Sequence, residues 1–296
     1  MYKLFARMVY HRISPILLSC QSRDQFGFTP GVRIEEALLV ADQIVSHSIE
    51  FNIPVWLISM DLRKAFDRIE HRALFDALQH CGLDDGYVAL LQQLYSSQLG
   101  SANDSEDFPI TRGVKQGDVL SSLLFNCVLD FAMNRWKLRI RHCGILIDDP
   151  NERLTDSRCA DDTLIFAKAL DEAILVLEVL IKELNRIGLN LNFLKTKIFH
   201  TAMTDDGHDV AFADIAGEIV EILDVDAYHR YLGKRLSLTN NGRSQIEVTH
   251  RIESAWAAFH KHRKIILNSH IPLHLRLKFS VLVHRRALCL LWQLYL

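Results

Sequence analysis

Two short apolar runs that end at aspartate side chains constrain this sequence more than any other feature. Residues 55–61 (VWLISMD) are typical of a buried strand that ends in a carboxylate, Asp61. One hundred residues later, residues 158–167 (RCADDTLIFA) are typical of a hairpin whose tip is Asp161-Asp162. If the two strands are neighbours, three carboxylates meet at one edge of a sheet. Like charges at such close range do not all stay ionised without a cation, so the pattern favours hard divalent ions such as Mg²⁺.

Phosphoryl transfer is the chemistry that such a site supports. Two divalent ions about 3.5–4 Å apart clamp a phosphoryl centre, one activating a hydroxyl and the other stabilising the leaving oxygen. A structural alternative stays open, because Asp-Asp is common in turns and Asp61 can cap the segment that follows it.

The remaining patterns alternate between helices and strands. Helices are expected at 74–81, 120–136, 171–187 and from 246 onward, a strand at 198–201, and a second hairpin near 231–238. Asp118 is a candidate N-cap for the second helix, and the third, the clearest amphipathic one, is capped by Asp171 and ended by Gly188. Helices between and after the strands predict an α+β fold with a split βαβ core rather than a doubly wound sheet.

The composition is that of an ordinary globular chain. With 296 residues, 49% of them hydrophobic, the chain has enough apolar surface for a sizeable core, which excludes a disordered protein. No segment approaches the roughly 20 apolar residues that span a bilayer, so no membrane association is expected. The six cysteines are scattered without a Cys-x-x-Cys pair, which argues against a disulfide framework or a structural zinc site and favours a reducing, intracellular setting.

Charge is distributed unevenly along the chain. Residues 1–23 contain basic side chains and no acid, residues 203–226 contain eight acids and no Lys or Arg, and residues 251–286 contain eight basic side chains and one acid. A boundary near the acidic stretch is therefore expected, separating a body from a basic helical tail, with the acidic stretch itself as a solvated loop. The net charge of −2 is the sum of these segments and does not exclude a nucleic-acid partner.

Several short motifs follow one another in an order that is more specific than any of them alone. They are Gln25–Gly31 (QFGFTPG), Asp61–Asp67 (DLRKAFD), Gly113–Asp118 (GVKQGD), Cys159–Asp162 (CADD), Gly188–Asn192 (GLNLN) with Lys195, and Tyr231–Gly233 (YLG). In this order they resemble the reverse transcriptase of non-LTR (LINE-like) retrotransposons, and the resemblance runs from about residue 3 to the C-terminus.

The resemblance implies an architecture. It is the right-hand fold of polymerases, an α+β palm with a split βαβ, ferredoxin-like core, partial fingers and a helical thumb. Residues 1–54 would be an N-terminal helical segment with part of the fingers, residues 55–240 the palm, and residues 241–296 a truncated, thumb-like helical segment. We expect the upstream fingers block and the endonuclease domain of the family to be missing, so that the chain is a fragment of a larger polyprotein.

The resemblance also implies catalytic roles. Asp61, Asp161 and Asp162 would bind two Mg²⁺ ions, with Mn²⁺ as an alternative. Lys195 would lie near the triphosphate, as a charge stabiliser or as a proton donor to pyrophosphate. An exposed lysine without a catalytic role is the competing interpretation of Lys195.

Nucleotide and primer contacts follow from the same resemblance. The residues assigned to the incoming nucleotide are Leu62, Phe66, Gln116 and Gly117, and those assigned to the primer are Cys159, Tyr231, Leu232 and Gly233. A bulky ring at Phe66 leaves no room for a 2′-hydroxyl and selects deoxynucleotides, a role compatible with core packing. Glycine at Gly117 permits a close backbone approach. The basic tail would contact backbone phosphates, as a thumb does.

The sequence departs from the family pattern at several positions. Cys159 replaces the usual aromatic or bulky apolar residue before Ala-Asp-Asp, and this removes a contact to the primer end. Val119 and Ser122 replace prolines at the start of a helix, Thr29 replaces a common arginine, and Arg33-Ile34 replaces Ser-Thr. Because of these departures, membership of the family does not by itself imply catalytic activity.

Four functional hypotheses follow. The first is RNA-directed DNA polymerisation with an RNA template, a DNA primer and dNTPs in an intracellular, nuclear setting that the family implies. The second is a decayed palm–thumb module that binds nucleic acid without extending a primer. The third is another two-metal palm enzyme, such as a nucleotidyl cyclase, which would not share the ordered motifs. The fourth, nucleophilic catalysis by Cys159, has no histidine in the adjoining sequence to support it.

Overall fold

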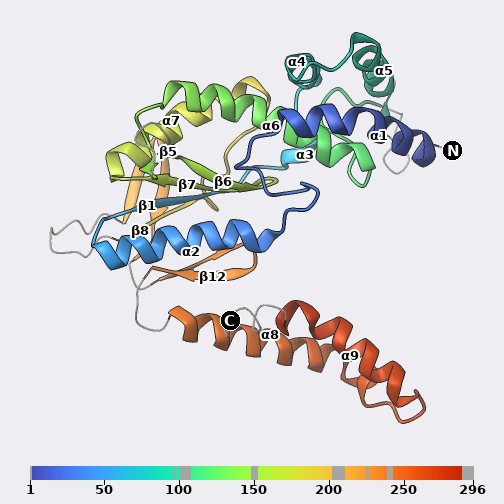
Figure 1. Ribbon diagram of the computed structural model, residues 1–296, viewed down its shortest axis with the longest axis vertical. Helices are drawn as coiled ribbons and strands as arrows, with labels where there is room; N and C mark the ends of the chain where they lie inside the picture. The colour runs from blue at the N-terminus through green and yellow to red at the C-terminus, as the bar shows by residue number, and fades with distance from the viewer. Residues whose placement is uncertain are drawn as a thin grey trace. The chain divides into compact units, whose positions relative to one another are not determined.

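The structure of the chain is a computed structural model (Figure 1). It describes residues 2–96, 98–100, 108–147, 153–201, 211–224, 227–238 and 243–288. The chain divides into two compact units, a first unit of Met1–Val225 and a second unit of Asp226–Leu296.

A six-stranded mixed sheet forms the centre of the first unit. Its strands, in spatial order, are β6 (Asp156–Cys159), β7 (Asp162–Ala167), β1 (Trp56–Met60), β8 (Lys197–His200), β10 (Glu218–Ile222) and β9 (Phe212–Ile215). Strand β1 pairs antiparallel with both β7 and β8, while β10 pairs parallel with β8. The predicted strand at 55–61, the hairpin at 158–167 and the strand at 198–201 are confirmed.

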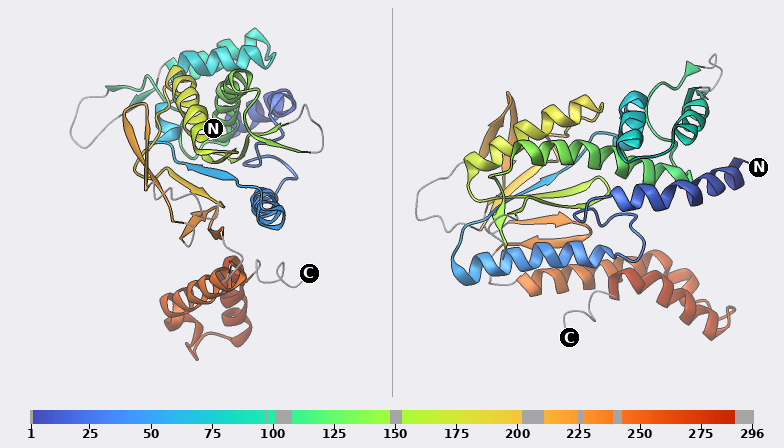
Figure 2. Two further views of the ribbon diagram at one scale, coloured as in Figure 1. Left: turned by 90° about the vertical axis from the view of Figure 1, so that its left-hand side faces the viewer. Right: turned by 45° about the horizontal axis from the view of Figure 1, so that its top comes forward.

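Two long helices, α6 (Val119–Arg139) and α7 (Leu170–Arg186), cover one face of this sheet (Figures 1 and 2). Helix α6 is apolar on nearly all sides because it is sandwiched between other elements, and the fully buried Trp136 donates its indole N–H to the carbonyl of Val176 at 2.8 Å. Asp118 caps α6 as predicted, since its carboxylate accepts a hydrogen bond from the N–H of Leu120. The helices are therefore fixed to the sheet and to each other.

The prediction that Asp171 caps α7 is wrong. The helix begins at Leu170, and its N-cap residue Ala169 makes no side-chain cap. Asp171 lies within the first turn because the helix begins before it. Glu172, also in the first turn, accepts a hydrogen bond at 3.2 Å from the N–H of Lys168, a residue that precedes the N-cap, so this bond ties the preceding segment to the helix rather than capping it.

The N-terminal segment is helical, as predicted. Helix α1 (Tyr2–Cys20) packs on α6, and α2 (Ile34–Phe51) lies along β6 on the opposite side of the sheet from α6 and α7 (Figure 1). Three shorter helices, α3 (Ala65–Arg68), α4 (His71–His80) and α5 (Asp85–Ser96), follow β1. The first unit also contains the two-stranded pairs β2 (Leu99–Gly100) with β3 (Phe108–Pro109), and β4 (Ile145–Leu146) with β5 (Arg153–Leu154). Assignment of residues 1–54 to the fingers stays a prediction.

The acidic stretch at 203–226 is not a loop where the structure describes it. Strands β9 and β10 occupy part of it, with Ala213, Ile215, Val220 and Ile222 buried, and with Asp214 and Glu221 exposed between them. Alternation of buried and exposed side chains is the strand period, which the density of acids concealed. Residues 202–210 and 225–226 of this stretch lie outside the described residues.

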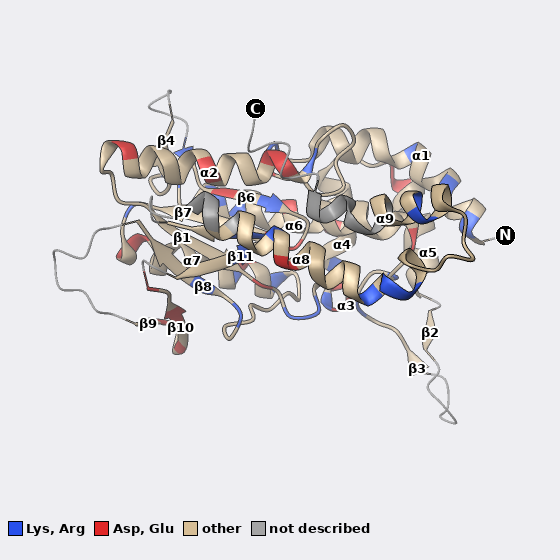
Figure 3. Cartoon of the chain, turned by 90° about the horizontal axis from the view of Figure 1, so that it is seen from below, with Lys and Arg blue, Asp and Glu red and all other residues tan. Residues whose placement is uncertain are grey.

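The second unit consists of a hairpin and two helices. Strands β11 (Tyr228–Tyr231) and β12 (Lys234–Ser237) form the hairpin, which packs on α8 (Arg243–Ile266), and α8 packs on α9 (Leu273–Leu288). Lys and Arg residues are distributed along both helices (Figure 3). The expected boundary at 240 lies outside the described residues, and the structure groups the hairpin with the helical tail. No helix in the described part of the chain is long and apolar enough to cross a membrane.

Candidate active site

The register of β1 and β7 brings the predicted carboxylates together. Met60 pairs with Thr163, so Asp61 and Asp162, the next residue in each strand direction, lie at the same end of the antiparallel pair. Partial burial, together with the charges of Asp161 and Asp61, raises the pKa of Asp162. The three carboxylates therefore share one electrostatic environment, as the sequence predicted.

Asp61 is held by the segment that precedes β8. The side-chain amide of Asn192 donates to the Asp61 carboxylate at 2.9 Å, and the backbone N–H of Asn192 donates to the Asp61 carbonyl at 2.8 Å. The ammonium group of Lys195 lies 3.8 Å from the other carboxylate oxygen of Asp61, and the lysine side chain is 70% exposed. Lys195 is thus at the site, as expected. Asn192 is the last residue of the Gly188–Asn192 motif, but the sequence did not predict that its side chain holds Asp61. Only the hydrogen bond in the structure shows this role.

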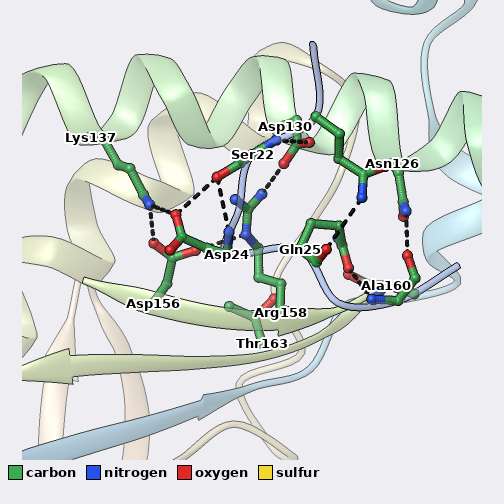
Figure 4. A network of polar contacts seen from close by, with 12 residues as sticks. Ser22, Asp24, Gln25, Asn126, Asp130, Lys137, Asp156, Arg158, Ala160 and Thr163 are labelled. Carbon is green, nitrogen blue, oxygen red and sulfur yellow. Dashed lines mark hydrogen bonds and ion pairs between the residues drawn. The ribbon is translucent and has the colours of Figure 1, made fainter. Parts of the chain in front are cut away.

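The turn that carries Asp161 has an unusual backbone. Ala160 has a φ of 60°, a left-handed conformation that residues with a side chain rarely adopt. Gln25, which is 2% exposed, stabilises this conformation: its side-chain oxygen accepts hydrogen bonds from the N–H of Ala160 at 2.8 Å and of Gly27 at 2.9 Å (Figure 4). Both N–H groups belong to buried residues, Ala160 and Gly27. Gln25 is therefore a positioning residue for Asp161-Asp162, across 135 positions of sequence.

Gly27 permits this arrangement because it has no side chain. A Cβ atom at Gly27 would lie 2.2 Å from the nitrogen of Ala160 and 2.7 Å from the carbonyl carbon of Cys159. Asn126 of α6 fixes the same segment by donating its side-chain amide to the Gly27 carbonyl at 2.7 Å. The segment around Gln25 is thus hydrogen-bonded to the turn at Ala160 on one side and to α6 on the other.

Paired charges lie beside this segment, between α6 and the strands (Figure 4). The fully buried guanidinium of Arg158 lies 2.5 Å from an Asp130 oxygen and 2.7 Å from an Asp156 oxygen. Lys137 pairs with Asp24 and, at 2.8 Å, with Asp156. Burial alone would raise the pKa of Asp156, but the charges of Arg158 and Lys137 hold this pKa below its usual value. None of these pairs was predicted, because their partners come from different elements.

The residues assigned to the incoming nucleotide lie around α3. The ring of Phe66 stacks on Phe125 of α6 with centroids 4.4 Å apart, and the side-chain amide of Gln116 donates to Asp67 at 3.3 Å. Gly117 has a φ of 81°, which favours glycine. The side chain of Leu62 is buried, so a nucleotide contact there would come from its main chain. The nucleotide contacts of these four residues stay predictions. The structure shows that the Phe66 ring is packed against the Phe125 ring.

The residues assigned to the primer fall into two groups. Cys159 lies beside the carboxylates, and burial together with the charges of Asp162 and Asp161 raises the pKa of its thiol to about 11. A neutral thiol is a poor nucleophile, which argues against the cysteine-enzyme hypothesis. Tyr231, Leu232 and Gly233 lie at the turn of the hairpin in the second unit, and their primer contact stays a prediction.

Oxygen donors for a divalent ion are present among the described residues. Among the described residues, no group of three or more His, Cys, Asp or Glu side chains is arranged to hold a metal ion. The three carboxylates are nonetheless the ligand type that Mg²⁺ prefers, and the pKa of Asp162 is raised by burial and also by the charges of Asp161 and Asp61, which a cation would offset. The residues therefore fit a divalent ion by charge and chemistry.

Fold and site together define a palm-type polymerase domain. The family model described as reverse transcriptase (RNA-dependent DNA polymerase) matches residues 1–236, and the chain belongs to this family. The Pol polyprotein of the type-2 retrotransposable element R2DM of Drosophila melanogaster is 31% identical over 172 residues, 57% of this chain and 16% of the relative. A Pol polyprotein of a type-1 element R2 of Popillia japonica is 32% identical over 133 residues, 43% of this chain and 18% of the relative. The predicted resemblance to non-LTR retrotransposon enzymes is thereby confirmed, and the matched regions span less than a fifth of these relatives.

Solved structures confirm the fold class. Apo telomerase from Candida tropicalis matches 97% of this chain and 50% of its own, with a TM-score of 0.53 and 12% identity. The form truncated from the C-terminal domain matches 73% of this chain and 45% of its own, with a TM-score of 0.51 and 15% identity. The α+β right-hand palm expected from the sequence is therefore the observed architecture.

Replacing Gln25 tests whether its side chain stabilises the turn at Ala160. In Gln25→Leu the buried N–H groups of Ala160 and Gly27 lose their acceptor, and we expect the free energy of unfolding to fall by about 2 kcal/mol or more. Gln79→Leu is the matched control, since this glutamine is exposed and the change should stay within about 0.5 kcal/mol. Urea denaturation followed by circular dichroism measures both, and equal effects would contradict the assigned role.

The raised pKa of Asp162 predicts a pH dependence. A raised folded-state pKa means that the folded chain binds the proton more tightly, so stability is lost as pH rises from the unfolded pKa through the folded one. In metal-free buffer, Asp162→Asn should therefore be more stable than the parent protein at neutral pH, with a gain that shrinks toward about pH 4. Urea denaturation over this range measures the gain. The exposed Asp76→Asn is the control, and a gain independent of pH would count against the carboxylate cluster.

Proposed function

We propose that this chain is the polymerising palm of an RNA-directed DNA polymerase, which extends the 3′-hydroxyl of a DNA primer with dNTPs on an RNA template. The observation that carries the proposal is the convergence of Asp61 with Asp161 and Asp162 at the end of β1 and β7, in a chain of the reverse transcriptase family. Three carboxylates at one edge suit metal-assisted phosphoryl transfer, and membership of the reverse transcriptase family favours nucleotidyl transfer among the reactions of that class.

Each residue of the site has a defined task in this reaction. Two Mg²⁺ ions held by Asp61, Asp161 and Asp162 would activate the primer hydroxyl and offset charge at the phosphate that is attacked. Lys195, exposed and next to Asp61, is placed to compensate charge on the departing pyrophosphate or to give it a proton. Phe66, stacked on Phe125, presents a ring that cannot easily move and would exclude a ribose 2′-hydroxyl.

The scaffold contributes by holding these groups before substrate arrives. Gln25 fixes the left-handed turn at Ala160, and Asn192 fixes one oxygen of Asp61. Groups that are prearranged do not have to be ordered during the reaction, which lowers the barrier. The second unit would contact the duplex through the basic residues of α8 and α9, in a salt-dependent manner.

Primer extension tests the proposal. Purified protein, a DNA primer annealed to an RNA template, Mg²⁺ and labelled dNTPs should give extended primer, and Asp161→Asn should lower the rate at least about hundredfold, because it removes charge where the transition state needs it. The exposed Asp76→Asn on α4 is the matched control and should retain the rate. Incorporation no greater than that of Asp161→Asn would refute the proposal. Salt-sensitive primer–template binding without extension would then favour a decayed module.

A further inference from the structure

One buried carboxylate on the helix layer of the first unit is surrounded by three arginines. The side chain of Glu183 on α7 is 1% exposed. Its oxygens lie 3.1 Å from Nε of Arg135, 2.8 Å from Nε of Arg139 and 3.1 Å from Nη1 of Arg186. Two of these arginines come from α6 and one from α7, so the cluster joins the two helices that cover the sheet.

The cluster carries more positive charge than the buried carboxylate requires. A buried carboxylate needs a well-placed partner, and one arginine supplies it. Three guanidinium groups and one carboxylate leave a net charge of +2, since arginine stays protonated in proteins. The arginine side chains are 37%, 52% and 48% exposed in the order Arg135, Arg139 and Arg186. The excess charge is therefore open to solvent.

The arginines are oriented for a second ligand. Arg135 and Arg139 direct Nε to Glu183, and in the described part of the chain no hydrogen bond engages their two terminal nitrogens. Arg135 also lies over the ring of Phe131, 5.5 Å from its centroid, which restricts its movement. Terminal guanidinium nitrogens bind phosphate oxygens in a bidentate manner, and prior ordering lowers the entropy that binding costs.

Further basic residues extend the cluster along the surface. Lys182 is exposed one helical turn before Arg186, and Arg141 and His142 are exposed just after α6 ends. Glu178, one turn before Lys182, is the nearest acid along that side of α7. Exposed basic residues thus continue along the sequence on either side of the three arginines, which favours a chain of phosphates over a single small anion.

The cluster is separate from the candidate active site. The loop that carries Gln116 and Gly117 precedes the first turn of α6, whereas Arg135 and Arg139 lie in its last two turns. At 1.5 Å per residue, Asp118 and Arg139 are separated by roughly 30 Å along the helix. A ligand at the arginines would therefore not be the incoming nucleotide.

We propose that Arg135, Arg139 and Arg186, held in place by Glu183, form a phosphate-binding site for a single-stranded RNA segment outside the active site. The inference deepens the proposed function, because an RNA template longer than the duplex supplies such a segment. Each arginine contributes a backbone contact that is independent of base sequence. The acidic active site and this basic surface thus bind different parts of one polymer.

Salt-dependent RNA binding tests the inference. Fluorescence anisotropy with a labelled, unprimed single-stranded RNA gives Kd at several salt concentrations for the full chain. Arg139→Gln and Arg186→Gln should each weaken binding about threefold to tenfold and reduce the slope of log Kd against log salt by about 0.7 to 1, the value of one lost phosphate contact. Arg72→Gln on α4 removes an exposed arginine of the same unit and should leave the slope unchanged. Slopes equal to that of Arg72→Gln would overturn the inference.

Competitors identify the ligand class. Displacement of the RNA by pyrophosphate at equal phosphate concentration would assign the cluster to a small anion, and displacement by polyglutamate would assign it to an acidic protein; either result overturns the inference. Resistance to both, with displacement by unlabelled RNA, supports it. The assay contains neither dNTP nor primer, so the RNA site can hold when primer extension fails, and extension can hold when the RNA site fails.

Discussion

Repulsion among three carboxylates at one edge of the sheet is the constraint on which the rest of the site depends. Asp61 and Asp162 lie at the same end of two paired strands, and Asp161 adds a third charge. Such an arrangement destabilises a fold unless the backbone around it is fixed by other interactions. The fixing groups are neutral amides, Gln25 at the turn and Asn192 at Asp61, and Lys195 adds one positive charge 3.8 Å from Asp61 against three carboxylates. The negative charge therefore stays available for a cation.

A second set of interactions keeps the supporting segment in place. Arg158, three residues before Asp161, is paired with two buried aspartates, and Lys137 links one of them to the N-terminal segment. Buried pairs of this kind contribute little net stability, but loss of one partner is costly, so they specify one geometry. The same helix, α6, carries Asn126 and Lys137 toward the site and Arg135 and Arg139 toward solvent. It thereby serves both the proposed chemistry and the proposed RNA contact.

The sequence predicted what short-range patterns encode. Strand β1 and the hairpin followed from their apolar runs, and the cap of α6 followed from Asp118. It did not predict Gln25 as the acceptor for Ala160 or the triple pairing of Glu183, because these partners are far apart along the chain and only the fold brings them together. The cap at Asp171 was wrong because the helix begins at Leu170, which places Asp171 within its first turn. The order of the motifs, rather than any one of them, identified the family.

Metal-directed cleavage tests the central claim, that Asp61, Asp161 and Asp162 form one divalent-ion site. Fe²⁺ bound in place of Mg²⁺ produces hydroxyl radicals in the presence of ascorbate and peroxide, and these cut the nearest backbone. The account predicts cuts at two places in the chain, next to Asp61 and next to Asp161, both suppressed by excess Mg²⁺ and both absent in Asp161→Asn. Cuts at one of the two places alone, or cuts that persist in Asp161→Asn, would contradict it.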